Sequence, residues 1–335
     1  MKALKVGVIG SGFGLYGLLP AFNSLENCEV VAICSKKTER VLEYCRDIGL
    51  SNIYSEWQLM LNKEKLDAVA IAVRPLEQYK IAKVAISKGI NIFAEKPLAI
   101  NYSQAKQMFD WAKKKKIVTA VDFIFPEIDV WQKAKQLLDS KALGELKHIF
   151  VNWSFISFDI KNKISSWKTD VGEGGGALSF YFSHSLYYLE YYAGEISDIK
   201  SEFFYSKGSI NKGEVGIDLL LKFKNGVNGD AHLSCNSRDI SRHRLIFKCE
   251  KGEIILENCS GVVDNFTLTI HKGGKKEVVK SNDVTVGNED ERVKIVRKLA
   301  SRFIEACVRD ERMTPSFKEG LRVQKLIEKI RMVQI

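Results

Sequence analysis

His184 is the first residue of this sequence that could carry out chemistry. It lies in the run GEGGGALSFYFSHSLYYLEYYAG, residues 172–194, among aromatic side chains and after three consecutive glycines. An imidazole accepts and releases protons near neutral pH, which suits a proton carrier. A histidine among aromatic residues can equally be a core residue. The rest of the chain must therefore distinguish between these two roles.

Lys96 is a second candidate for proton transfer. Glu95-Lys96-Pro97 directly follows the apolar run INIFA, which predicts a strand. In an open sheet of parallel strands, ligands bind beyond the carboxyl ends of the strands, where a lysine can touch a hydroxyl group. Pro97 disfavours helical geometry at Lys96 and makes a cis peptide bond feasible. An ordinary surface turn would explain the same three residues.

The first 122 residues predict the scaffold that positions Lys96. Short apolar runs alternate with segments of helical periodicity. Continuous apolar strands of this kind indicate a parallel sheet with helices on both faces, and right-handed crossovers then give a doubly wound α/β domain, the Rossmann fold. We expect strands at 4–10, 28–35, 66–73, 90–95 and 117–124, and helices at 15–25, 38–49, 77–89 and 103–116. We assign residues 1–122 to this domain.

The first turn of this domain predicts a dinucleotide site. Gly10-Ser11-Gly12-Phe13-Gly14 follows the first strand and opens the first helix, which is the context that the glycine pattern requires. Gly10 permits the tight turn, and Gly12 lets a pyrophosphate approach the backbone at the helix N-terminus. Leu15 stands where the strict pattern has its third glycine, a departure that concerns the packing of helix on strand.

The end of the second strand predicts which dinucleotide binds. An acidic residue there favours NAD because it binds the ribose hydroxyl. This chain has Ser35-Lys36-Lys37 with Arg40 a turn later, and these groups can hold a 2′-phosphate that a carboxylate would repel. We therefore expect NADP in preference to NAD, unless the lysines only decorate a surface loop. The other residues expected at the cofactor are Val73, Arg74, Gln78, Glu95, Lys96 and Asp122.

Several segments resemble the glucose–fructose oxidoreductase and myo-inositol dehydrogenase family, Gfo/Idh/MocA. They are VGVIGSGFG with LLPAF, AEKPLA, WQKAKQLLDSKALGELKHI and GEGGGAL with the following SH and YLEYYAG. The resemblance implies an N-terminal Rossmann domain and a C-terminal α/β domain with a large, open, mostly antiparallel sheet. It implies NAD(P)-dependent hydride transfer to or from a sugar, cyclitol or nucleotide sugar. It also implies that Lys96 is the catalytic lysine, that Glu95 helps to fix the nicotinamide, and that the Lys96–Pro97 bond is often cis.

His184 matches this family, but its surroundings differ. The family's helix reads G-G-G-x-L-x-D-x-G-x-H, with the aspartate and histidine as catalytic pair, and Phe180 occupies the aspartate position here. The resemblance favours an imidazole that faces the nicotinamide, on one helix that starts near Ala177, with Tyr181 or Tyr187 as further acids. We expect the triple glycine to let the backbone approach the cofactor. The missing aspartate leaves an alternative open, a protein that binds NAD(P) and nucleotide sugar but is catalytically impaired.

Residues 123–335 predict a domain for substrate binding and oligomerisation. Strand-like runs fill 146–273, with hairpin turns at Asn225-Gly226 and Lys251-Gly252, and two helices close the chain. A broad sheet with one uncovered face predicts a homodimer or homotetramer. Arg238 and Arg242, grouped with His243 and Arg244 in SRDISRHRL, would bind a phosphate or carboxylate unless they are solvated loop charges. The full set of expected substrate contacts is Lys96, Trp167, Lys168, Phe180, His184, Arg238 and Arg242.

Composition argues against several other classes of protein. The net charge of +10 is spread over 335 residues, and the one dense run, 113–116, suits a helix C-terminus, so we expect no nucleic-acid partner. We expect no membrane partner and no secretory signal, because the apolar runs are too short. Seven cysteines without a C-x-x-C motif favour free thiols in the cytoplasm, and five scattered histidines predict no metal site.

Overall fold

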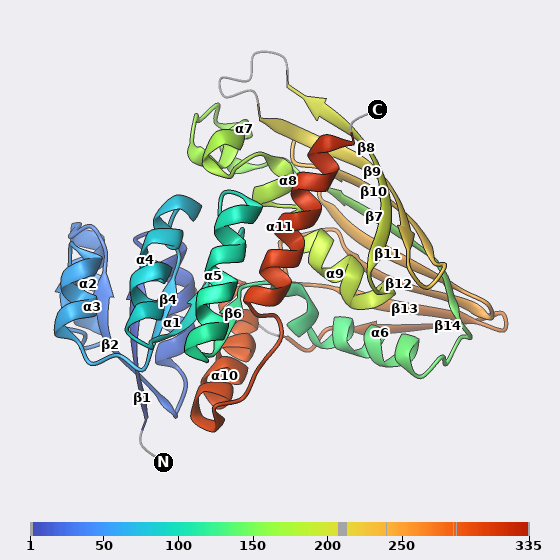
Figure 1. Cartoon of the computed structure of the whole chain (residues 1–335). Helices are drawn as coiled ribbons and strands as arrows, with labels where there is room; N and C mark the ends of the chain where they lie inside the picture. The colour runs from blue at the N-terminus through green and yellow to red at the C-terminus, as the bar shows by residue number, and fades with distance from the viewer. Residues whose placement is uncertain (1–2, 207–212, 239, 284, 286, 334–335) are drawn as a thin grey trace. The chain divides into compact units, whose positions relative to one another are not determined.

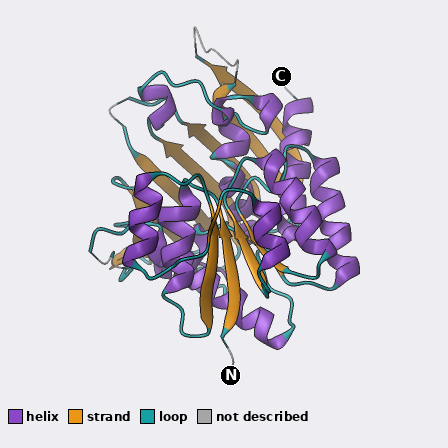
Figure 2. Cartoon of the chain, turned by 90° about the vertical axis from the view of Figure 1, so that its left-hand side faces the viewer, coloured by secondary structure: helices purple, strands orange, loops and turns teal. Residues whose placement is uncertain are grey.

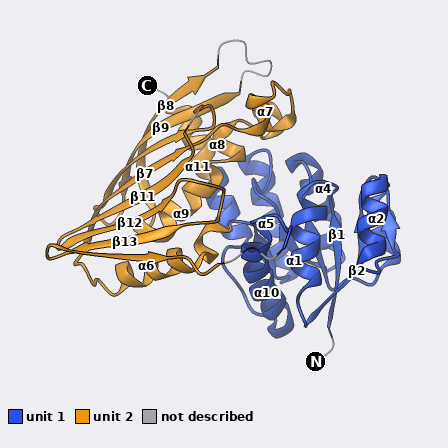
Figure 3. Ribbon diagram, turned by 180° about the vertical axis from the view of Figure 1, so that it is seen from behind, with its two compact units in different colours: residues 1–123, 285–324 blue, residues 124–284, 325–335 orange. Residues whose placement is uncertain are grey.

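The chain folds into two compact units, which Figure 3 colours separately. The computed structural model describes residues 3–206, 213–238, 240–283, 285 and 287–333. One unit comprises residues 1–123 and 285–324, and the other residues 124–284 and 325–335. The division after residue 123 lies next to the expected boundary, whereas segment 285–324 groups with the first unit and had been assigned to the second.

The N-terminal unit is built on a six-stranded parallel sheet. Its strands are β1 (Leu4–Ile9), β2 (Cys28–Cys34), β3 (Ile53–Tyr54), β4 (Ala68–Ile71), β5 (Asn91–Ala94) and β6 (Thr119–Val121), in the order β3-β2-β1-β4-β5-β6. The order reverses between β1 and β4, which is the switch point where open sheets bind ligands. The predicted doubly wound domain is confirmed, and the two-residue β3 was too short for its pattern to indicate a strand.

Helices cover both faces of this sheet, as Figure 2 shows with helices in purple and strands in orange. They are the π-helix η1 (Gly14–Leu18), α1 (Leu19–Asn23), α2 (Glu39–Asp47), α3 (Trp57–Lys63), α4 (Pro75–Ser87) and α5 (Tyr102–Lys115). The side chain of Asn101 caps α5 by accepting a hydrogen bond from the N–H of Gln104 (2.9 Å). Lys113, Lys114 and Lys115 occupy its last turn, where the helix dipole favours cations. The dense lysine run therefore has the place predicted from the sequence.

Two helices, α10 (Val293–Arg309) and α11 (Phe317–Met332), lie near the C-terminus of the chain. Phe303 of α10 is fully buried, and its ring centroid lies 6.3 Å from that of Phe22 and 5.8 Å from that of Phe93. Burying such a ring stabilises a fold by several kcal/mol, roughly 3–5. This packing onto α1 and β5 explains why residues 285–324 belong to the first unit.

The C-terminal unit is built on an eight-stranded sheet. Its strands are β7 (Leu146–Ser154), β8 (Ile196–Tyr205), β9 (Glu214–Phe223), β10 (Asn228–Ser234), β11 (Arg242–Cys249), β12 (Gly252–Asn258), β13 (Thr267–Lys272) and β14 (Lys275–Lys280), in the order β14-β13-β12-β11-β7-β10-β9-β8. Only the pair of β7 and β10 is parallel among these described strands. The predicted large, mostly antiparallel sheet is confirmed; the mainly exposed and charged β14 was missed.

Helices lie along one face of this sheet (Figure 1). They are α6 (Asp129–Asp139), α7 (Phe158–Lys161), α8 (Ala177–Phe180) and α9 (Ser183–Ala193), with 3-10 turns η2 (Phe125–Glu127), η3 (Trp167–Thr169) and η4 (Val171–Glu173). The ring of Tyr192 on α9 lies 4.6 Å from that of Phe247 on β11. On the opposite face, Phe150 and Leu220 are 37% and 55% exposed. In the described ranges, no helix has the length and apolar character needed to cross a membrane.

Candidate active site

The glycine turn after β1 is shaped to receive a ligand. Gly10 has a φ of +138°, and a Cβ on it would lie 2.2 Å from the carbonyl oxygen of Ala72. Only glycine suits that position. Around Gly12, no described atom beyond the two neighbouring residues of the chain lies within 4 Å of the place that a Cβ would take, so the backbone there is open. This cradle at the switch point of the sheet fits the diphosphate of a dinucleotide.

The helix after this turn begins with the π-helix η1. A Cβ on Gly14 would lie 3.3 Å from the carbonyl oxygen of Ile9, so Gly14 permits the close packing of helix on strand. Leu15, at the position of the missing third glycine, is a buried core residue. Gly17, which sequence reasoning missed, makes room for Phe13, because a Cβ on Gly17 would lie 2.3 Å from the Phe13 ring.

A group of cations follows β2. Ser35 is buried, and its hydroxyl donates to the carbonyl oxygen of Lys36 at 3.3 Å. Lys36, Lys37 and Arg40 are exposed, and the Arg40 guanidinium lies 5.8 Å from the ring centroid of Tyr16. These side chains give the carboxyl end of β2 a positive surface, which can bind an anion such as a ribose phosphate.

A buried glutamine holds the loop that carries Lys96. The Lys96–Pro97 bond is cis, as the family resemblance implied. Gln78 of α4 is 1% exposed, and its amide nitrogen donates to the carbonyl oxygens of Glu95 (2.7 Å), Pro97 (3.3 Å) and Leu98 (3.0 Å). Gln78, expected at the cofactor, thus fixes the backbone beside Lys96.

The remaining cofactor candidates lie at strand ends. Val73 and Arg74 lie between β4 and α4, and Arg74 is the exposed residue that precedes α4. Asp122 follows β6 and is 3% exposed. Burial and the charge of Glu95 raise the pKa of Asp122 well above its ordinary value, while Lys96 and Arg292 oppose this shift. Arg292 gave no signal in the sequence, because it reaches this strand end from the distant start of α10.

The triple glycine packs within its own unit. A Cβ on Gly175 would lie 2.0 Å from the carbonyl oxygen of Trp167, and one on Gly176 would lie 2.4 Å from the carboxylate of Glu214. Gly176 also has a φ of +82°, which favours glycine. The expectation that these glycines let the backbone approach a cofactor is therefore wrong for Gly175 and Gly176, since protein atoms fill the space beside them.

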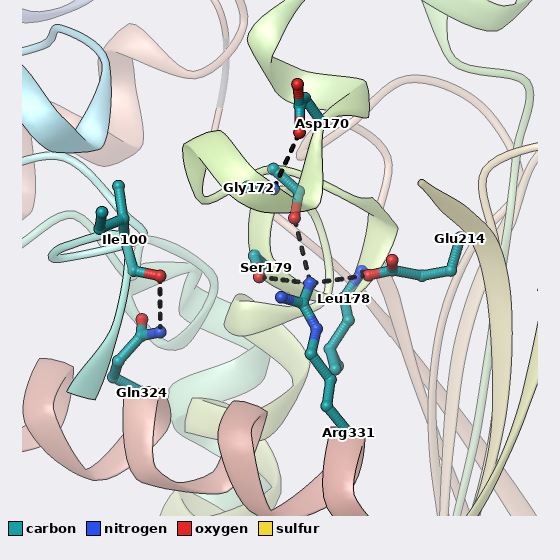
Figure 4. Close-up of polar contacts among 9 residues, drawn as sticks. Ile100, Asp170, Gly172, Leu178, Ser179, Glu214, Gln324 and Arg331 are labelled. Carbon is teal, nitrogen blue, oxygen red and sulfur yellow. Dashed lines mark hydrogen bonds and ion pairs between the residues drawn. The ribbon is translucent and has the colours of Figure 1, made fainter. Parts of the chain in front are cut away.

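An arginine and a glutamate hold the start of α8 (Figure 4). Buried Glu214 accepts hydrogen bonds from the N–H of Leu178 and from the guanidinium of Arg331, both at 3.1 Å. Arg331 also donates to the carbonyl oxygen of Gly175 (3.1 Å) and to the hydroxyl of Ser179 (3.0 Å). The last turn of α11 therefore fixes the segment that leads into α9 and His184.

The helix predicted from Ala177 is broken before His184. α8 ends at Phe180 and α9 begins at Ser183, and between them the N–H of Phe182 donates to the carbonyl oxygen of Ala177 at 3.0 Å, which closes a six-residue turn. Three consecutive aromatic rings pack on three different partners: Phe180 on Trp167 (5.2 Å), Tyr181 on Phe155 (5.0 Å) and Phe182 on Trp153 (5.6 Å). His184 and Phe180 thus do not share a continuous helix face.

His184 lies in an aromatic cluster on the covered face of the C-terminal sheet. It is 8% exposed, and its ring centroid lies 5.0 Å from that of Phe125 and 6.5 Å from that of Trp153. The imidazole is therefore much less open than expected. Tyr187 is also buried, at 9% exposure, whereas Tyr181 is half-buried.

A second histidine of the same cluster is a core residue. His243 stacks on Trp153 at 4.4 Å, and its Nε2 lies 3.0 Å from the hydroxyl of Tyr188, which in turn lies 2.8 Å from the hydroxyl of Ser185. Burial lowers the pKa of His243 to about 3. The side chain is therefore neutral at physiological pH.

Alternation along β11 separates His243 from its neighbours. Arg242 and Arg244 share Glu257 of β12 at 3.5 and 3.7 Å, on the face away from Tyr188. Arg238 is exposed before the strand. The predicted grouping of these arginines with His243 in one pocket is wrong, because successive residues of a strand point to opposite faces.

Three predicted substrate residues do come together. The rings of Trp167 and Phe180 meet edge to face at 5.2 Å, and the ammonium of Lys168 lies 5.3 Å from the centroid of Phe180. All three side chains are half-buried. They form an aromatic surface with a cation beside it.

An open glycine turn at the switch point of a doubly wound parallel sheet is typical of dinucleotide-binding domains. The sequence matches the model of the Gfo/Idh/MocA oxidoreductase family, NAD-binding Rossmann fold, over residues 4–123, and that of the Gfo/Idh/MocA C-terminal domain over residues 131–255. The chain belongs to this family and is an NAD(P)-dependent oxidoreductase.

Relatives and solved structures agree with this assignment. An uncharacterized oxidoreductase of Synechocystis is 24% identical over 97% of this chain and 92% of its own length. The structure of levoglucosan dehydrogenase with NADH and levoglucosan has a TM-score of 0.86 at 20% identity, covering 99% of this chain and 97% of its own. A 3-ketoreductase of Actinomadura kijaniata, solved with NADP and TDP-benzene, has a TM-score of 0.82 at 18% identity, covering 99% and 98%. At these identities the structures show a shared fold.

Proposed function

We propose that this protein transfers a hydride between NADP(H) and a hydroxyl or keto group of a sugar or nucleotide sugar. The observation that carries the proposal is the Glu95-Lys96-Pro97 loop, which Gln78 fixes at the carboxyl end of β5, in the sheet that also carries the open glycine turn. Both features lie at the end of the sheet where Rossmann domains bind their cofactors.

The relatives and the aromatic surface at Trp167 support the substrate class. Relatives include a levoglucosan dehydrogenase, a D-apiose dehydrogenase and a dTDP-sugar 3-reductase. Aromatic rings such as Trp167 and Phe180 offer apolar faces on which the C–H groups of a sugar can pack. Lys168 adds a charge that can bind phosphate. We infer that these three residues contact the substrate.

The preference for NADP rests on this chain's own residues. Neighbouring structures contain NADH in one case and NADP in another, so they do not decide between the two. Lys36, Lys37 and Arg40 are exposed after β2, where the ribose of a bound cofactor lies in Rossmann domains. Ser35 stands where an acidic residue would favour NAD, and three cations follow it. This arrangement favours binding of the additional phosphate of NADP.

A bound nicotinamide supplies the acceptor or donor of the hydride, and the chain's own residues handle the accompanying proton. We propose Lys96 as the group that takes the hydroxyl proton, because a desolvated amine near a cationic ring is shifted toward its neutral form. His184 is proposed as the second proton-transfer residue, with Tyr181 and Tyr187 as further acids. Phe180 has no proton to give and cannot replace the family's aspartate.

Turnover distinguishes this proposal from a protein that binds cofactor without reacting. Purified protein should oxidise or reduce the cofactor with at least one member of a panel of sugars and nucleotide sugars. A kcat of about 1–1000 s⁻¹ is usual for enzymes. Tight binding of NADPH without turnover of any panel member would support the impaired binder that Phe180 suggests, an alternative that the family assignment does not favour.

We also propose a homodimer or homotetramer formed through the open face of the C-terminal sheet. Phe150 and Leu220 expose apolar surface there. Light scattering should give the mass of two or four chains, and Leu220→Lys should lower it to that of one chain. The cytoplasm stays our proposed location, in keeping with seven free cysteines.

A further inference from the structure

Arg292 lies against the glycine turn although it is distant from that turn in the sequence. It directly precedes α10, and its guanidinium carbon lies 4.4 Å from the ring centroid of Phe13, the residue between Gly12 and Gly14. A cation over an aromatic ring is attracted by the quadrupole of that ring. Both segments belong to the N-terminal unit. The fold therefore brings a positive charge to the turn that fits a diphosphate.

The ring of Phe13 is held in place by its neighbours. A Cβ on Gly17 would lie 2.3 Å from this ring, so the bare backbone of Gly17 leaves the room that the ring fills. Tyr16 meets Phe13 edge to face, with ring centroids 5.7 Å apart. The guanidinium of Arg40 in turn lies 5.8 Å from the centroid of Tyr16. Each of these two aromatic rings at the glycine turn thus carries one guanidinium.

Asp290 holds Arg292 in one orientation. Its carboxylate accepts hydrogen bonds from Nε and Nη2 of Arg292 at 2.8 and 2.7 Å, and from the backbone N–H of Arg292 at 3.0 Å. This two-point pair leaves Nη1 without a hydrogen bond to any residue that the structure describes. The side chain of Arg292 is 32% exposed, so a ligand can reach it. A planar guanidinium fixed in this way is suited to donate to phosphate oxygens.

We propose that Arg292 is a cofactor-binding residue, whose guanidinium donates hydrogen bonds to the diphosphate of NADP(H) together with the backbone N–H groups of the glycine turn. The inference rests on the proposed function. It divides recognition of the cofactor between two guanidinium groups. Arg292 binds the diphosphate, which NAD and NADP share, whereas Arg40 with Lys36 and Lys37 binds the 2′-phosphate that only NADP has. Arg292 therefore adds affinity without adding preference.

Titration calorimetry of Arg292→Gln with three ligands tests this division. The ligands are NADPH, NADH and adenosine 2′-phosphate, which lacks the diphosphate. NADPH and NADH should both bind about tenfold more weakly, because a charge-assisted hydrogen bond is lost, and adenosine 2′-phosphate should bind as it does to the parent. Lys37→Ala should show the opposite pattern, with weaker binding of NADPH and adenosine 2′-phosphate and unchanged binding of NADH. A weaker affinity of Arg292→Gln for all three ligands would mean that Arg292 only supports the fold of the turn, and would overturn the inference.

Arg297→Gln is the matched control on the same helix. Arg297 pairs with Glu289 at 3.1 Å and donates to the hydroxyl of Ser24 at 2.7 Å, so its loss also breaks an ion pair of α10. We expect this variant to bind NADPH and NADH as the parent does. Unchanged NADH affinity in Arg292→Gln, or an equal loss in Arg297→Gln, overturns the inference.

Two further outcomes have defined meanings. If Arg292→Gln does not fold, Arg292→Lys replaces it and must weaken NADPH and NADH by similar, smaller factors, since a lysine keeps the charge but not the planar fork. A parent that binds both dinucleotides but turns over no substrate contradicts the proposed hydride transfer, while the binding data still test Arg292. A parent that binds neither dinucleotide contradicts both proposals.

Discussion

We expect opposite roles for two histidines of one aromatic cluster, proton transfer for one and core packing for the other. The rings of His184 and His243 lie 5.0 and 4.9 Å from that of Phe125, yet only His184 matches the family's reactive position. His184→Gln should lower kcat about 100-fold with little change in Tm. His243→Gln should lower Tm by several degrees, for roughly 1–3 kcal/mol of lost buried contacts, while the folded fraction keeps its specific activity. Thermal unfolding and kcat of both variants check this pair, and the reverse pattern would make His184 the core residue.

The burial of His243 also predicts a pH dependence of stability. Its pKa is about 3 in the folded chain and roughly 6.5 when unfolded. Between these values the unfolded chain binds a proton that the folded chain cannot, so this contribution to stability is complete above about pH 6.5 and is lost as the pH falls. Its upper bound is roughly 5 kcal/mol. Denaturant unfolding measures the free energy of unfolding at each pH from 7 to 4. This free energy should fall more steeply with decreasing pH in the parent and in His148→Gln than in His243→Gln. Equal pH slopes in all three proteins would contradict this expectation.

The cations after β2 predict the cofactor preference. Lys36→Ala and Lys37→Ala should each weaken NADPH binding about fivefold, for about 1 kcal/mol at an exposed site, and leave NADH binding unchanged. Lys114→Ala, at the end of α5, is the control. Fluorescence titration measures all three variants, and equal affinities of the parent for NADPH and NADH would remove the basis of the preference.

The residues that could be predicted at this scale are contiguous in the sequence. Gly10, Gly12 and Lys96 belong to short motifs whose spacing alone points to their places. Arg292 and the bonding of Gln78 could not be predicted, because they depend on segments that meet only after folding. Proximity in sequence predicts that Arg242 lies beside His243, but alternation along the strand separates the two side chains in space.

At the scale of elements, the end of α11 fixes the start of α8. Arg331→Met would leave Glu214, which is 4% exposed, with the N–H of Leu178 as its remaining hydrogen-bond donor among the described residues. Removing one partner of a buried ion pair costs about 3–5 kcal/mol, and partial exposure of Arg331 places the expected loss near the lower end. Lys325→Met, at an exposed position of the same helix, should change stability by less than about 0.5 kcal/mol. Denaturant unfolding measures the free energy of unfolding of both variants. Similar losses of stability in the two would show that the Arg331 contacts contribute little to the stability of the fold.

Sequence patterns predict the presence of helices and strands better than they predict where these elements begin and end. The strands β1, β2, β4 and β5 were predicted because unbroken apolar runs have few other interpretations. The break between α8 and α9 was not predicted. The rings of Phe180, Tyr181 and Phe182 pack on residues that are distant in the sequence, and helical propensity carries no information about such contacts. The charged strand β14 lacks an apolar face and therefore lacks the signal.

At the scale of the whole molecule, packing explains why residues 285–324 belong to the first unit. Phe303→Ala should destabilise that unit by about 3–5 kcal/mol, because the ring is fully buried against Phe22 and Phe93. Calorimetry should show an earlier transition that NADPH shifts back upward, as ligand binding to the folded state requires. Phe158→Ala, whose ring is 68% exposed, should leave the transition in place. A Phe303→Ala transition that stays unchanged would contradict this assignment of α10.

The most direct test of the account is the kinetics of Lys96→Met, measured on the best substrate of the panel together with fluorescence titration of NADPH. In the proposed mechanism Lys96 transfers a proton, whereas the glycine turn and the cations after β2 bind the cofactor. We therefore expect an NADPH Kd close to that of the parent and a kcat lowered about 100-fold or more. A variant with near-normal kcat would show that Lys96 is only a turn residue, and the proposed chemistry would be wrong.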